Sequence, residues 1–319
     1  MKTLLSVALL FLMVIPAAAH SVVVEGNRYV VTHCWDDAGR QRECTVSVPI
    51  SQYRYFQGRS HRSSDLSQFV LSDYGRDFVR DLADSFDGDL HSVFSFVQSL
   101  RYVSDYESKG EEEYVRFPME TLVDGIGDCE DLAILAAALL NEMGYRVLMV
   151  TLPEHMALAV NCDEDVHGTY YIYHGSRYYY LEVTHAGWEL GRIPDEYRNS
   201  QVKLVPLKHQ PRIHIRRCSY QYDSYTSAER EVPIRVVCDL ENTGPCRTSD
   251  LSVRVQLKRR NGTVASERVF RLDDLGEGES STGELVFRVP RPYSGEIEVR
   301  VEGENFDTES LLFEEIELR

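Results

Sequence analysis

The spacing of hydrophobic positions changes along the chain, and each spacing predicts a different kind of element. Residues 21–50 alternate apolar and polar side chains around turns at Gly26 and Gly39, which predicts a short β-meander. Residues 51–64 are polar and are expected to form a loop. Over 65–85 the apolar side chains recur at helical spacing, which predicts one broken helix or two. They are Leu66, Phe69, Val70, Tyr74, Phe78 and Leu82.

Two more helices follow in the pattern. The first is predicted from about Leu90 to Tyr102, with one apolar face, and an acidic loop over 104–124 comes after it. The second is predicted to begin at Cys129, directly after a glycine-rich turn, and to run to about Met143, where a glycine follows. Its apolar residues occupy most positions, so it is expected to pack in the core.

Four strands are predicted after this helix, and the last two form a hairpin. They cover residues 146–152, 156–162, 170–173 and 178–184. Helices followed by an antiparallel sheet indicate an α+β domain. From about Arg212 onward, short strands recur between turns that contain Asn and Gly. This pattern is typical of an all-β, Ig-like sandwich of roughly immunoglobulin size.

The N-terminus has the composition of a secretory signal peptide. Lys2 precedes an apolar run from Leu4 to Ile15, then Pro16 and three alanines, so cleavage is expected after Ala19. The alternative is an uncleaved membrane anchor, but the run is short for a span. The expected parts of the chain are therefore a signal peptide (1–19), a β-meander (20–58), an α+β domain (59–208) and an Ig-like β-sandwich (209–319). A secreted or cell-surface location follows.

The charge balance narrows the class of partner. The chain has 51 acidic and 34 basic residues and a formal net charge of −17. This excess of negative charge argues against nucleic acid and anionic lipid as partners. A protein or peptide substrate remains compatible with it. The sequence does not indicate an oligomeric state.

The chain has seven cysteines, and an odd number outside the cytoplasm leaves at least one thiol unpaired. Cys34 and Cys44 flank a polar turn and could bridge two strands of a hairpin. Cys129 and Cys162 remain without an evident partner. In the C-terminal region one pair is expected, either Cys238–Cys246 or Cys218–Cys238.

Cys129, His155 and Glu182 form a plausible catalytic set. A thiol at the start of a helix faces unpaired N–H groups and the positive end of the helix dipole, which favour the nucleophilic thiolate. His155 begins a predicted strand, and Glu182 lies in the last strand of the domain. Cys, His and a carboxylate are the nucleophile, base and orienting group of covalent acyl transfer. Asp128 and Glu130 oppose this, because nearby negative charge raises a thiol pKa.

Each of the three residues also has a structural alternative. Cys129 could be a small buried side chain of a core helix, and His155 could be one of the ten histidines with no chemical role. For Glu182 a solvated carboxylate on the outer face of its strand is the default expectation.

Metal chemistry is less well indicated. His33–Cys34 and Cys162–His167 are neighbours in sequence, but neither pair has zinc-ligand spacing. No zinc site is therefore expected. A calcium site is better indicated than a zinc site, because Asp128, Glu130 and Asp131 offer oxygen ligands in one tight turn.

Three segments resemble, in the correct order, the motifs of the transglutaminase-like superfamily. They are Gly-Asp-Cys-Glu-Asp-Leu-Ala at 127–133, His-Met-Ala-Leu-Ala-Val at 155–160 and Tyr-Leu-Glu-Val-Thr at 180–184. Residues 117–122 are similar to the segment that precedes the Cys in prokaryotic members. The resemblance covers about residues 60–200.

The resemblance implies a papain-like cysteine core. Cys129 would be the nucleophile, His155 the general base, and Glu182 the carboxylate that orients His155. The family usually has Asp followed by Pro-Thr at the third position, whereas this chain has Glu182, Val183 and Thr184. One periplasmic branch with a similar Asp-Cys-Glu turn depends on calcium, which makes Asp128 and Glu130 possible calcium ligands; no other cofactor is implied.

The activity expected from this resemblance is hydrolysis of a peptide or amide bond through a Cys129 thioester, as in a cysteine protease or amidase. The alternatives are amine transfer onto a glutamine side chain and a non-catalytic surface or adhesion protein that keeps the fold. The C-terminal region is similar to Ig-like domains appended to prokaryotic surface enzymes, which would bind a partner or act as a spacer.

Overall fold

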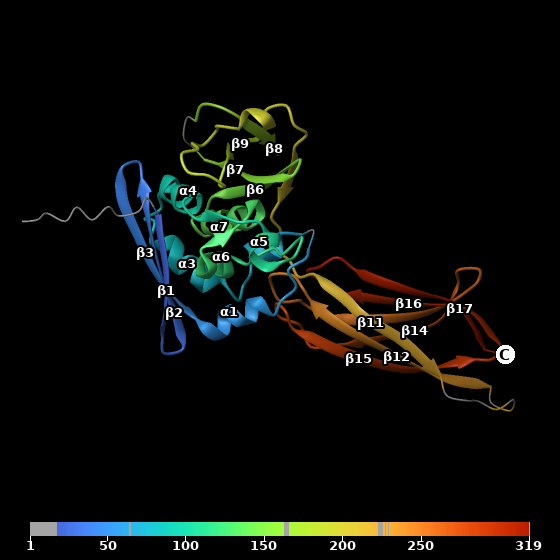
Figure 1. The fold of residues 1–319 in the computed structure, drawn as a ribbon. Coiled ribbons are helices and arrows are strands. Elements are labelled where there is room, and N and C mark those ends of the chain that lie inside the picture. The colour runs from blue at the N-terminus through green and yellow to red at the C-terminus, as the bar shows by residue number, and fades with distance from the viewer. Residues whose placement is uncertain are drawn as a thin grey trace, which may run out of the picture.

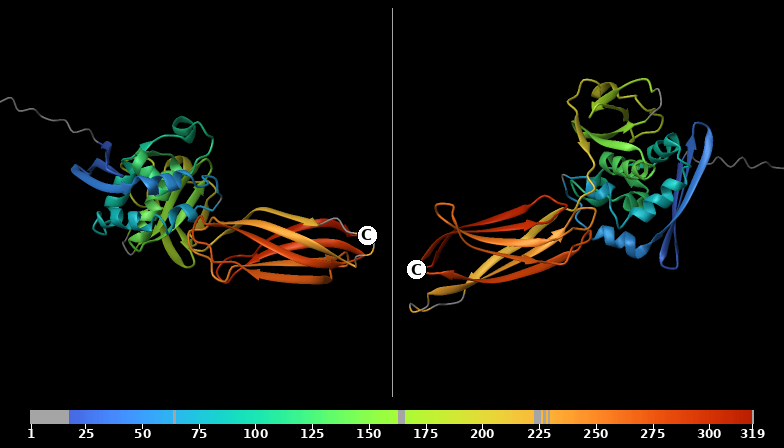
Figure 2. Two further views of the ribbon diagram at one scale, coloured as in Figure 1. Left: turned by 90° about the horizontal axis from the view of Figure 1, so that it is seen from below. Right: turned by 180° about the vertical axis from the view of Figure 1, so that it is seen from behind.

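The computed structural model describes residues 18–63, 65–162, 166–222, 226, 228 and 230–318. The chain mixes helices and strands, as expected for α+β, and forms a helix-containing lobe and an elongated β lobe (Figure 1). The C-terminus lies at the end of the β lobe that is farther from the helices (Figure 2). Most of the predicted signal peptide lies outside the described residues, and its last two residues, Ala18 and Ala19, already belong to the first strand.

The predicted N-terminal meander is present as a three-stranded antiparallel sheet in the order β1-β2-β3. The strands are β1 (Ala18–Glu25), β2 (Arg28–Asp37) and β3 (Arg40–Pro49). Alternate side chains of β2 and β3 are buried against the helices, as the period of a strand requires. This sheet therefore shares one hydrophobic core with the helical part of the lobe.

The expected loop at 51–64 is wrong in its first half, where α1 (Ile50–Gln57) forms. Tyr53 and Phe56 lie three positions apart and are both buried on the inner face of this helix. Two apolar residues in a polar segment give too weak a periodicity to predict a helix, so tertiary packing decides its structure.

The segment 65–85 contains two helices, one of the two options predicted. They are α2 (Ser67–Val70) and α3 (Arg76–Asp84), and α3 begins after Gly75. An added Cβ on Gly75 would lie 3.0 Å from the Phe56 ring, so a side chain here would crowd the packing of α1 against α3.

The next helix is shorter than predicted. α4 (Leu90–Gln98) is capped by Asp89, whose carboxylate accepts hydrogen bonds from two backbone N–H groups. The chain then forms β4 (Arg101–Tyr102), which pairs in parallel with β5 (Ile126–Gly127). This pairing ends the helix before Tyr102 and holds the chain beside the turn that precedes Cys129.

The expected acidic loop at 104–124 is also wrong in part, because it contains two short helices. They are α5 (Asp105–Lys109), capped by the Ser104 hydroxyl, and α6 (Pro118–Asp124), which has Pro at its first position. Proline at a helix start is favourable because its missing N–H would have no partner there.

The helix predicted from Cys129 is the centre of the lobe. α7 (Cys129–Glu142) is buried at every position from 131 to 140 and packs against β6 and β7 on one side and helices on the other. The sheet has the order β10-β6-β7-β9-β8. Its strands are β6 (Arg146–Leu152), β7 (His155–Asn161), β8 (Tyr170–Tyr173), β9 (Ser176–Leu181) and β10 (Lys203–Pro206). The last of these was not predicted.

The β lobe consists of two antiparallel sheets that share one hydrophobic core. One sheet has the order β11-β12-β15 and the other β14-β13-β16-β17. The strands are β11 (Ile213–Tyr222), β12 (Glu231–Asn242), β13 (Ser252–Arg259), β14 (Val264–Arg271), β15 (Ser280–Pro290), β16 (Tyr293–Glu302) and β17 (Glu309–Leu318). The layered all-β arrangement agrees with the sequence pattern.

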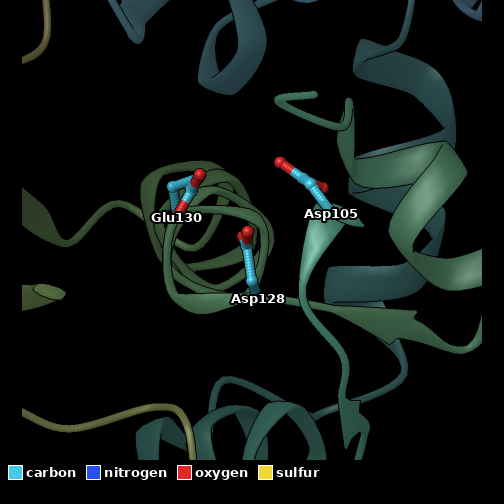
Figure 3. Close-up of side chains that lie close together, drawn as sticks. All are labelled: Asp105, Asp128 and Glu130. Carbon is cyan, nitrogen blue, oxygen red and sulfur yellow. The ribbon is translucent and has the colours of Figure 1, made fainter. Parts of the chain in front are cut away.

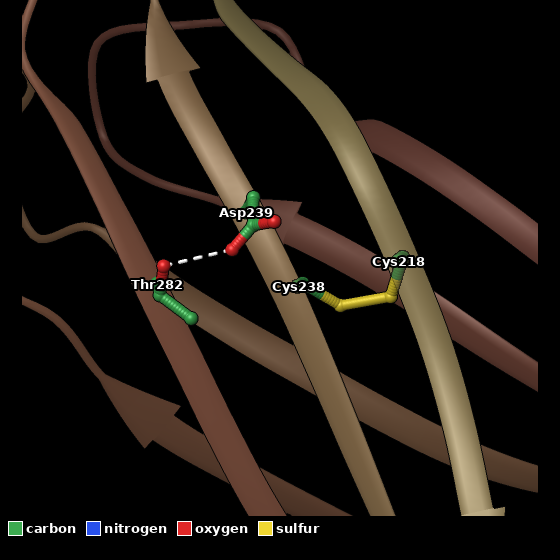
Figure 4. Close-up of a disulfide and its surroundings, with 4 residues drawn as sticks. All are labelled: Cys218, Cys238, Asp239 and Thr282. Atoms are coloured by element: carbon green, nitrogen blue, oxygen red, sulfur yellow. Dashed lines mark hydrogen bonds between the residues drawn. A yellow bond between two sulfur atoms is a disulfide. The ribbon is translucent and has the colours of Figure 1, made fainter.

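One disulfide joins neighbouring strands of the β lobe. Cys218 of β11 and Cys238 of β12 are bonded, next to the hydrogen bond from Thr282 to Asp239 (Figure 4). This is one of the two pairings that the sequence left open.

The bridge considered between Cys34 and Cys44 does not form. β2 and β3 are paired in a register that sets Cys34 opposite Glu43 and His33 opposite Cys44. Because successive side chains point to opposite faces of a sheet, the two thiols lie on different faces. Cys44 is buried, while Cys34 is partly exposed.

A loop of the β lobe docks on the helical lobe. The Glu277 carboxylate, between β14 and β15, accepts hydrogen bonds from the Ser72 hydroxyl at 2.8 and 3.0 Å and from the backbone N–H of Tyr74 at 3.2 Å. Arg59 and Glu241 form an ion pair at 3.6 Å across the same junction. Among the described residues, no helix is long and apolar enough to cross a membrane.

Candidate functional site

The turn before α7 fixes the position of Cys129. Asp128 caps the helix, with its Oδ1 3.5 Å from the backbone nitrogen of Asp131, and the Asp131 Oδ2 accepts in return from the backbone N–H of Asp128 at 3.4 Å. A Cβ on Gly127 would lie only 2.6 Å from the Cβ of Asp131. The glycine therefore allows the turn to approach the helix, and Cys129 becomes its first residue.

A buried arginine holds the same turn in place through ion pairs and hydrogen bonds. Arg116 is fully buried, and its Nη1 contacts Asp105 Oδ1 at 2.9 Å and Asp131 Oδ2 at 2.5 Å. Its backbone N–H donates to Asp131 Oδ1 at 2.6 Å, and its Nη2 donates to the Ser108 hydroxyl at 2.6 Å. These charge-assisted hydrogen bonds join α5, the segment before α6 and the first turn of α7.

The Cys129 thiol is partly exposed and faces an acidic neighbour. Its Sγ donates a hydrogen bond to Glu130 Oε2 at 3.1 Å. Burial first, and then the charge of Glu130 and this hydrogen bond, raise the pKa of the Cys129 thiol, against a smaller lowering effect of the Met156 backbone N–H. The acidic neighbours noted in the sequence therefore act together with burial to favour the neutral thiol.

His155 and Glu182 form a hydrogen-bonded pair. The His155 Nε2 lies 2.9 Å from Glu182 Oε2. Glu182 is 1% exposed, so the default expectation of a solvated carboxylate is wrong. Burial alone would raise the pKa of Glu182, but the hydrogen bonds from His155 and Thr184 and the charge of His155 lower it to about 2. The carboxylate is therefore ionised at neutral pH, and it holds the proton of the imidazole on Nε2.

Several donors hold the Glu182 carboxylate in place. Oε2 also accepts from the Tyr180 hydroxyl at 2.8 Å, and Oε1 accepts from the Thr184 hydroxyl at 2.8 Å. The backbone N–H groups of Val183 and Thr184 add contacts to Oε1 at 2.9 and 3.1 Å. A carboxylate with five hydrogen-bond donors is fixed, and it fixes the orientation of His155.

The structure brings the start of β7 to the N-terminus of α7. The backbone N–H of Met156, next to His155, lies close enough to Cys129 to lower the pKa of its thiol, and the Tyr197 ring stacks on the His155 ring with centres 4.8 Å apart and planes 3° apart. His155 and Glu182 are thus joined directly. The Cys129 thiol lies near Met156, the residue after His155, and its side-chain hydrogen bond goes to Glu130.

Four tyrosine and threonine side chains at the site were not identified from the sequence. Tyr180 and Thr184 lie two positions either side of Glu182, so strand alternation is a signal that could have found them. Tyr197 lies in the single-turn helix Asp195–Tyr197, and no pattern marks it. Tyr102 of β4 lies opposite Gly127, two residues before Cys129, and burial first and the charge of Cys129 next raise the pKa of Tyr102 to about 12.

Three carboxylates converge beside Cys129. Each of Asp105, Asp128 and Glu130 offers an oxygen, and these oxygens lie within 4.8 Å of one another (Figure 3). Burial first, and then the charges of Asp131 and Glu130, raise the pKa of Asp128. Asp131, considered as a ligand from the sequence, contacts Arg116 instead. Asp105 takes its place, and it was not predicted because α5 lies far away in the sequence.

The donor set suits a hard cation. Carboxylate oxygens are the ligands that calcium prefers. The positive charge of Arg116 reaches Asp105 but is also shared with Asp131 and Asp124. Asp105 of the cluster therefore shares one cation with two further carboxylates.

Residues 86–184 match a family described as a transglutaminase-like domain. The match contains Cys129, His155 and Glu182, and members of this family are usually thiol-dependent enzymes. A search of curated proteins finds no match to this chain.

Several solved structures show distant likeness to this chain. An ApaA-like protein from Bordetella pertussis has 15% identity and a TM-score of 0.25, with 34% of this chain and 92% of that chain covered. A protein from Archaeoglobus fulgidus has 11% identity and a TM-score of 0.22, covering 33% of this chain and 98% of that one. A family 2 β-glucuronidase has 10% identity and a TM-score of 0.29, covering 53% and 21%. These TM-scores are too low to support a conclusion about function.

Proposed function

We propose that this protein is a thiol-dependent hydrolase of peptide or amide bonds that acts through a Cys129 thioester. The observation that carries the proposal is the pair of His155 and the ionised Glu182, which lies at the strand start next to the helix N-terminus that bears Cys129. A buried, ionised carboxylate that fixes one tautomer of an imidazole beside a thiol is the arrangement of nucleophile, base and orienting group.

The tautomer determines which nitrogen exchanges the proton. Because Glu182 accepts from Nε2, the lone pair of the neutral His155 ring is on Nδ1. In the proposed reaction Nδ1 takes the proton from Cys129 Sγ as the sulfur attacks the carbonyl carbon. The same proton passes to the leaving amine, and the C–N bond breaks to give the thioester. Water, deprotonated by His155, then attacks the thioester and releases a carboxylate and the Cys129 thiol.

Two donors are proposed for the oxyanion of this reaction. One is the backbone N–H of Cys129, since the first N–H groups of a helix have no partner within it. The other is the Tyr102 hydroxyl, because Tyr102 lies opposite Gly127, two residues before Cys129, and a phenol is protonated at neutral pH and can donate.

We propose calcium as the ion that suits the site formed by Asp105, Asp128 and Glu130. Their oxygens lie close enough to share one ion. Bound calcium would supply positive charge that offsets the acidic groups beside the Cys129 thiol. Within the chain, Glu130 has the decisive position, because its carboxylate both contacts the thiol and belongs to this cluster.

The calcium proposal predicts a stabilised protein. Millimolar CaCl2 should raise the midpoint of thermal unfolding, since an ion that binds only the native state stabilises it. Glu130→Gln should weaken this effect, whereas Glu284→Gln, on the surface of the β lobe, should leave it unchanged. An equal response of all three proteins would contradict the site.

The proposal extends to the core fold, the β lobe and the location of the protein. The helix with Cys129 packed on an antiparallel sheet with His155 supports a papain-like core, and the two-sheet β lobe supports an Ig-like domain. Such a domain would bind a partner or set the distance between the enzyme and a surface. The apolar N-terminal segment with its Ala17–Ala19 end supports a secreted or cell-surface protein.

A peptide library and a labelled amine test the reaction. Wild type should shorten peptides and form a thioester adduct on Cys129 that hydroxylamine removes, and Cys129→Ala should lose at least about three orders of magnitude in kcat/KM. Cys34→Ala, remote from the site, is the matched control. Incorporation of the labelled amine without shortening would favour amine transfer. No turnover and no adduct in wild type would leave a binding protein and overturn the proposal.

A further inference from the structure

Three side chains of the kinds that bind metals, two histidines and one cysteine, form a row across the N-terminal sheet. His20 of β1 lies opposite His33 of β2, and His33 lies opposite Cys44 of β3. His33 and Cys44 are buried, and β2 packs against α4 and α6. Two helices therefore cover β2 at this row, where His20 is half-buried, and none of the three residues belongs to the proposed catalytic set.

The hydrogen bonds of His33 define its tautomer. The His33 Nε2 lies 2.7 Å from the Ser99 hydroxyl, and this hydroxyl donates its own hydrogen to the Phe96 carbonyl at 2.6 Å. Ser99 therefore accepts, and Nε2 of His33 carries the hydrogen. In the neutral imidazole the lone pair is then on Nδ1.

The same reasoning applies to His20. Its Nε2 lies 3.3 Å from the Val123 carbonyl oxygen, which can only accept, so Nε2 carries the hydrogen and Nδ1 has the lone pair. The ring packs directly on Gly125, where an added Cβ would lie 2.4 Å from the His20 ring. The absence of a side chain at Gly125 makes room for this imidazole.

Both Nδ1 atoms are buried and have no hydrogen-bond partner among the described residues. One buried unsatisfied acceptor costs about 1–3 kcal/mol, so two in adjacent residues need an explanation such as an ion. The ring centres are 5.6 Å apart, with planes 52° apart. Two imidazoles bound to one zinc ion at Zn–N distances of about 2.0–2.1 Å have ring centres roughly 5–6 Å apart.

We propose that Nδ1 of His20 and Nδ1 of His33 bind one Zn²⁺ ion. A metal-bound histidine usually donates its other N–H to a carbonyl or hydroxyl that fixes the ring, as Val123 and Ser99 do here. Imidazole nitrogen suits zinc rather than calcium or magnesium. The site departs from the expectation of no zinc, because cross-strand pairing is invisible in sequence spacing.

The ion would tie the N-terminal sheet to the helices around the reactive thiol. His20 contacts α6 at its end, through Val123 and Gly125, and the chain reaches Cys129 within the next few residues. His33 contacts α4 through Ser99. Zinc binding is thus expected to stabilise the native lobe, independently of whether the protein is an enzyme.

The test measures zinc in the full-length chain. The protein is stripped with a chelator, dialysed against ZnCl2 and then against metal-free buffer, and its metal content is determined by mass spectrometry. Wild type should retain close to one zinc per chain, with X-ray absorption showing nitrogen ligands at about 2.0–2.1 Å. His20→Gln and His33→Gln should each lose most of the retained zinc, while His91→Gln, at the surface, should keep it.

The acidic cluster is the competing site. Asp128→Asn with Glu130→Gln should retain the zinc of wild type, and loss of zinc in this double variant would overturn the proposal. Folded wild type without retained zinc, or an absorption spectrum with oxygen ligands only, would overturn it as well. The spectrum of wild type decides the question even if a histidine variant does not fold.

Discussion

Glu182 shows how the neighbours of one residue determine its chemistry. A buried carboxylate would ordinarily become neutral, but here five donors surround it and its pKa falls to about 2. Thr184 supplies two of these donors and Tyr180 one. Because the longer side chain of Glu still reaches His155 at 2.9 Å, the departure from the usual Asp of the family does not prevent the contact.

The pH dependence of stability should reveal this carboxylate. Its pKa falls from 4.5 to about 2 on folding, so the stabilisation is complete above about pH 5 and is lost as the pH falls toward 2. Glu182→Gln lacks this contribution. In urea unfolding, the advantage of wild type over Glu182→Gln should be constant above about pH 5 and shrink by about 3 kcal/mol toward pH 2. A pH-independent difference would contradict the assignment.

The Tyr102 hydroxyl should increase kcat without changing the reactivity of the Cys129 thiol toward an alkylating reagent. Removing one oxyanion donor costs about 10²–10³ in kcat, so Tyr102→Phe should show this loss with a nearly unchanged rate of Cys129 alkylation. Tyr106→Phe, a highly exposed tyrosine of α5, is the matched control. A normal kcat in Tyr102→Phe would remove the hydroxyl from the proposed mechanism.

The three catalytic candidates and the neighbours of Glu182 on its own strand have signals in the sequence, whereas Asp105 and Tyr102 do not. Cys129, His155 and Glu182 lie in motifs with the correct order. Asp105 and Tyr102 come from segments whose position beside Cys129 depends on the pairing of β4 with β5. β4 and β5 have two residues each, which is too short for a hydrophobic pattern to show in the sequence.

At the scale of elements, segments with a clear hydrophobic pattern were predicted well and short helices without one poorly. α7 and the strands β6 to β9 have strong hydrophobic patterns and were confirmed to within a few residues. α1, α5 and α6 have 5 to 8 residues, and isolated helices of this length are unstable in water. Their structure depends on packing and on Arg116, which local sequence cannot reveal.

Arg116 should be essential for the stability of this packing. Arg116→Met would leave Asp105 and Asp131 buried without their counter-charge, and removing one partner of a buried ion pair costs about 3–5 kcal/mol. Arg80→Met removes an exposed ion pair with Asp77 and should cost less than about 1 kcal/mol. Urea unfolding of the two variants measures this difference. Equal stability of the two variants would show that the network contributes little.

At the scale of the whole molecule, the β lobe is held to the helical lobe by a small polar junction. Glu277 is its centre, and Gly278 permits the approach, because an added Cβ would lie 2.1 Å from Nη1 of Arg59. The junction does not include Cys129 or His155. Docking of the β lobe is therefore expected to set the orientation of the two lobes and not the reactivity of the Cys129 thiol.

Glu277→Ala should separate these two properties. Without the carboxylate, the Ser72 hydroxyl and the Tyr74 N–H lose their partner, so the connecting segment 207–212 should be cut faster in limited proteolysis. The alkylation rate of Cys129 should change less than about twofold. Glu284→Ala, which removes an exposed ion pair with Arg235, is the control and should alter neither property. Loss of Cys129 reactivity in Glu277→Ala would show that the lobes are coupled.

The measurement that tests the central claim most directly is the alkylation rate of Cys129 at neutral pH, in calcium, in wild type and in His155→Ala. Mass spectrometry of the peptides also gives the rates of Cys34 and Cys246 as internal controls. We predict that Cys129 reacts at least about ten times faster than these thiols and that His155→Ala removes the difference. Equal rates for Cys129 in both proteins, at the level of the control thiols, would contradict a thiol–imidazole pair and the enzyme that it implies.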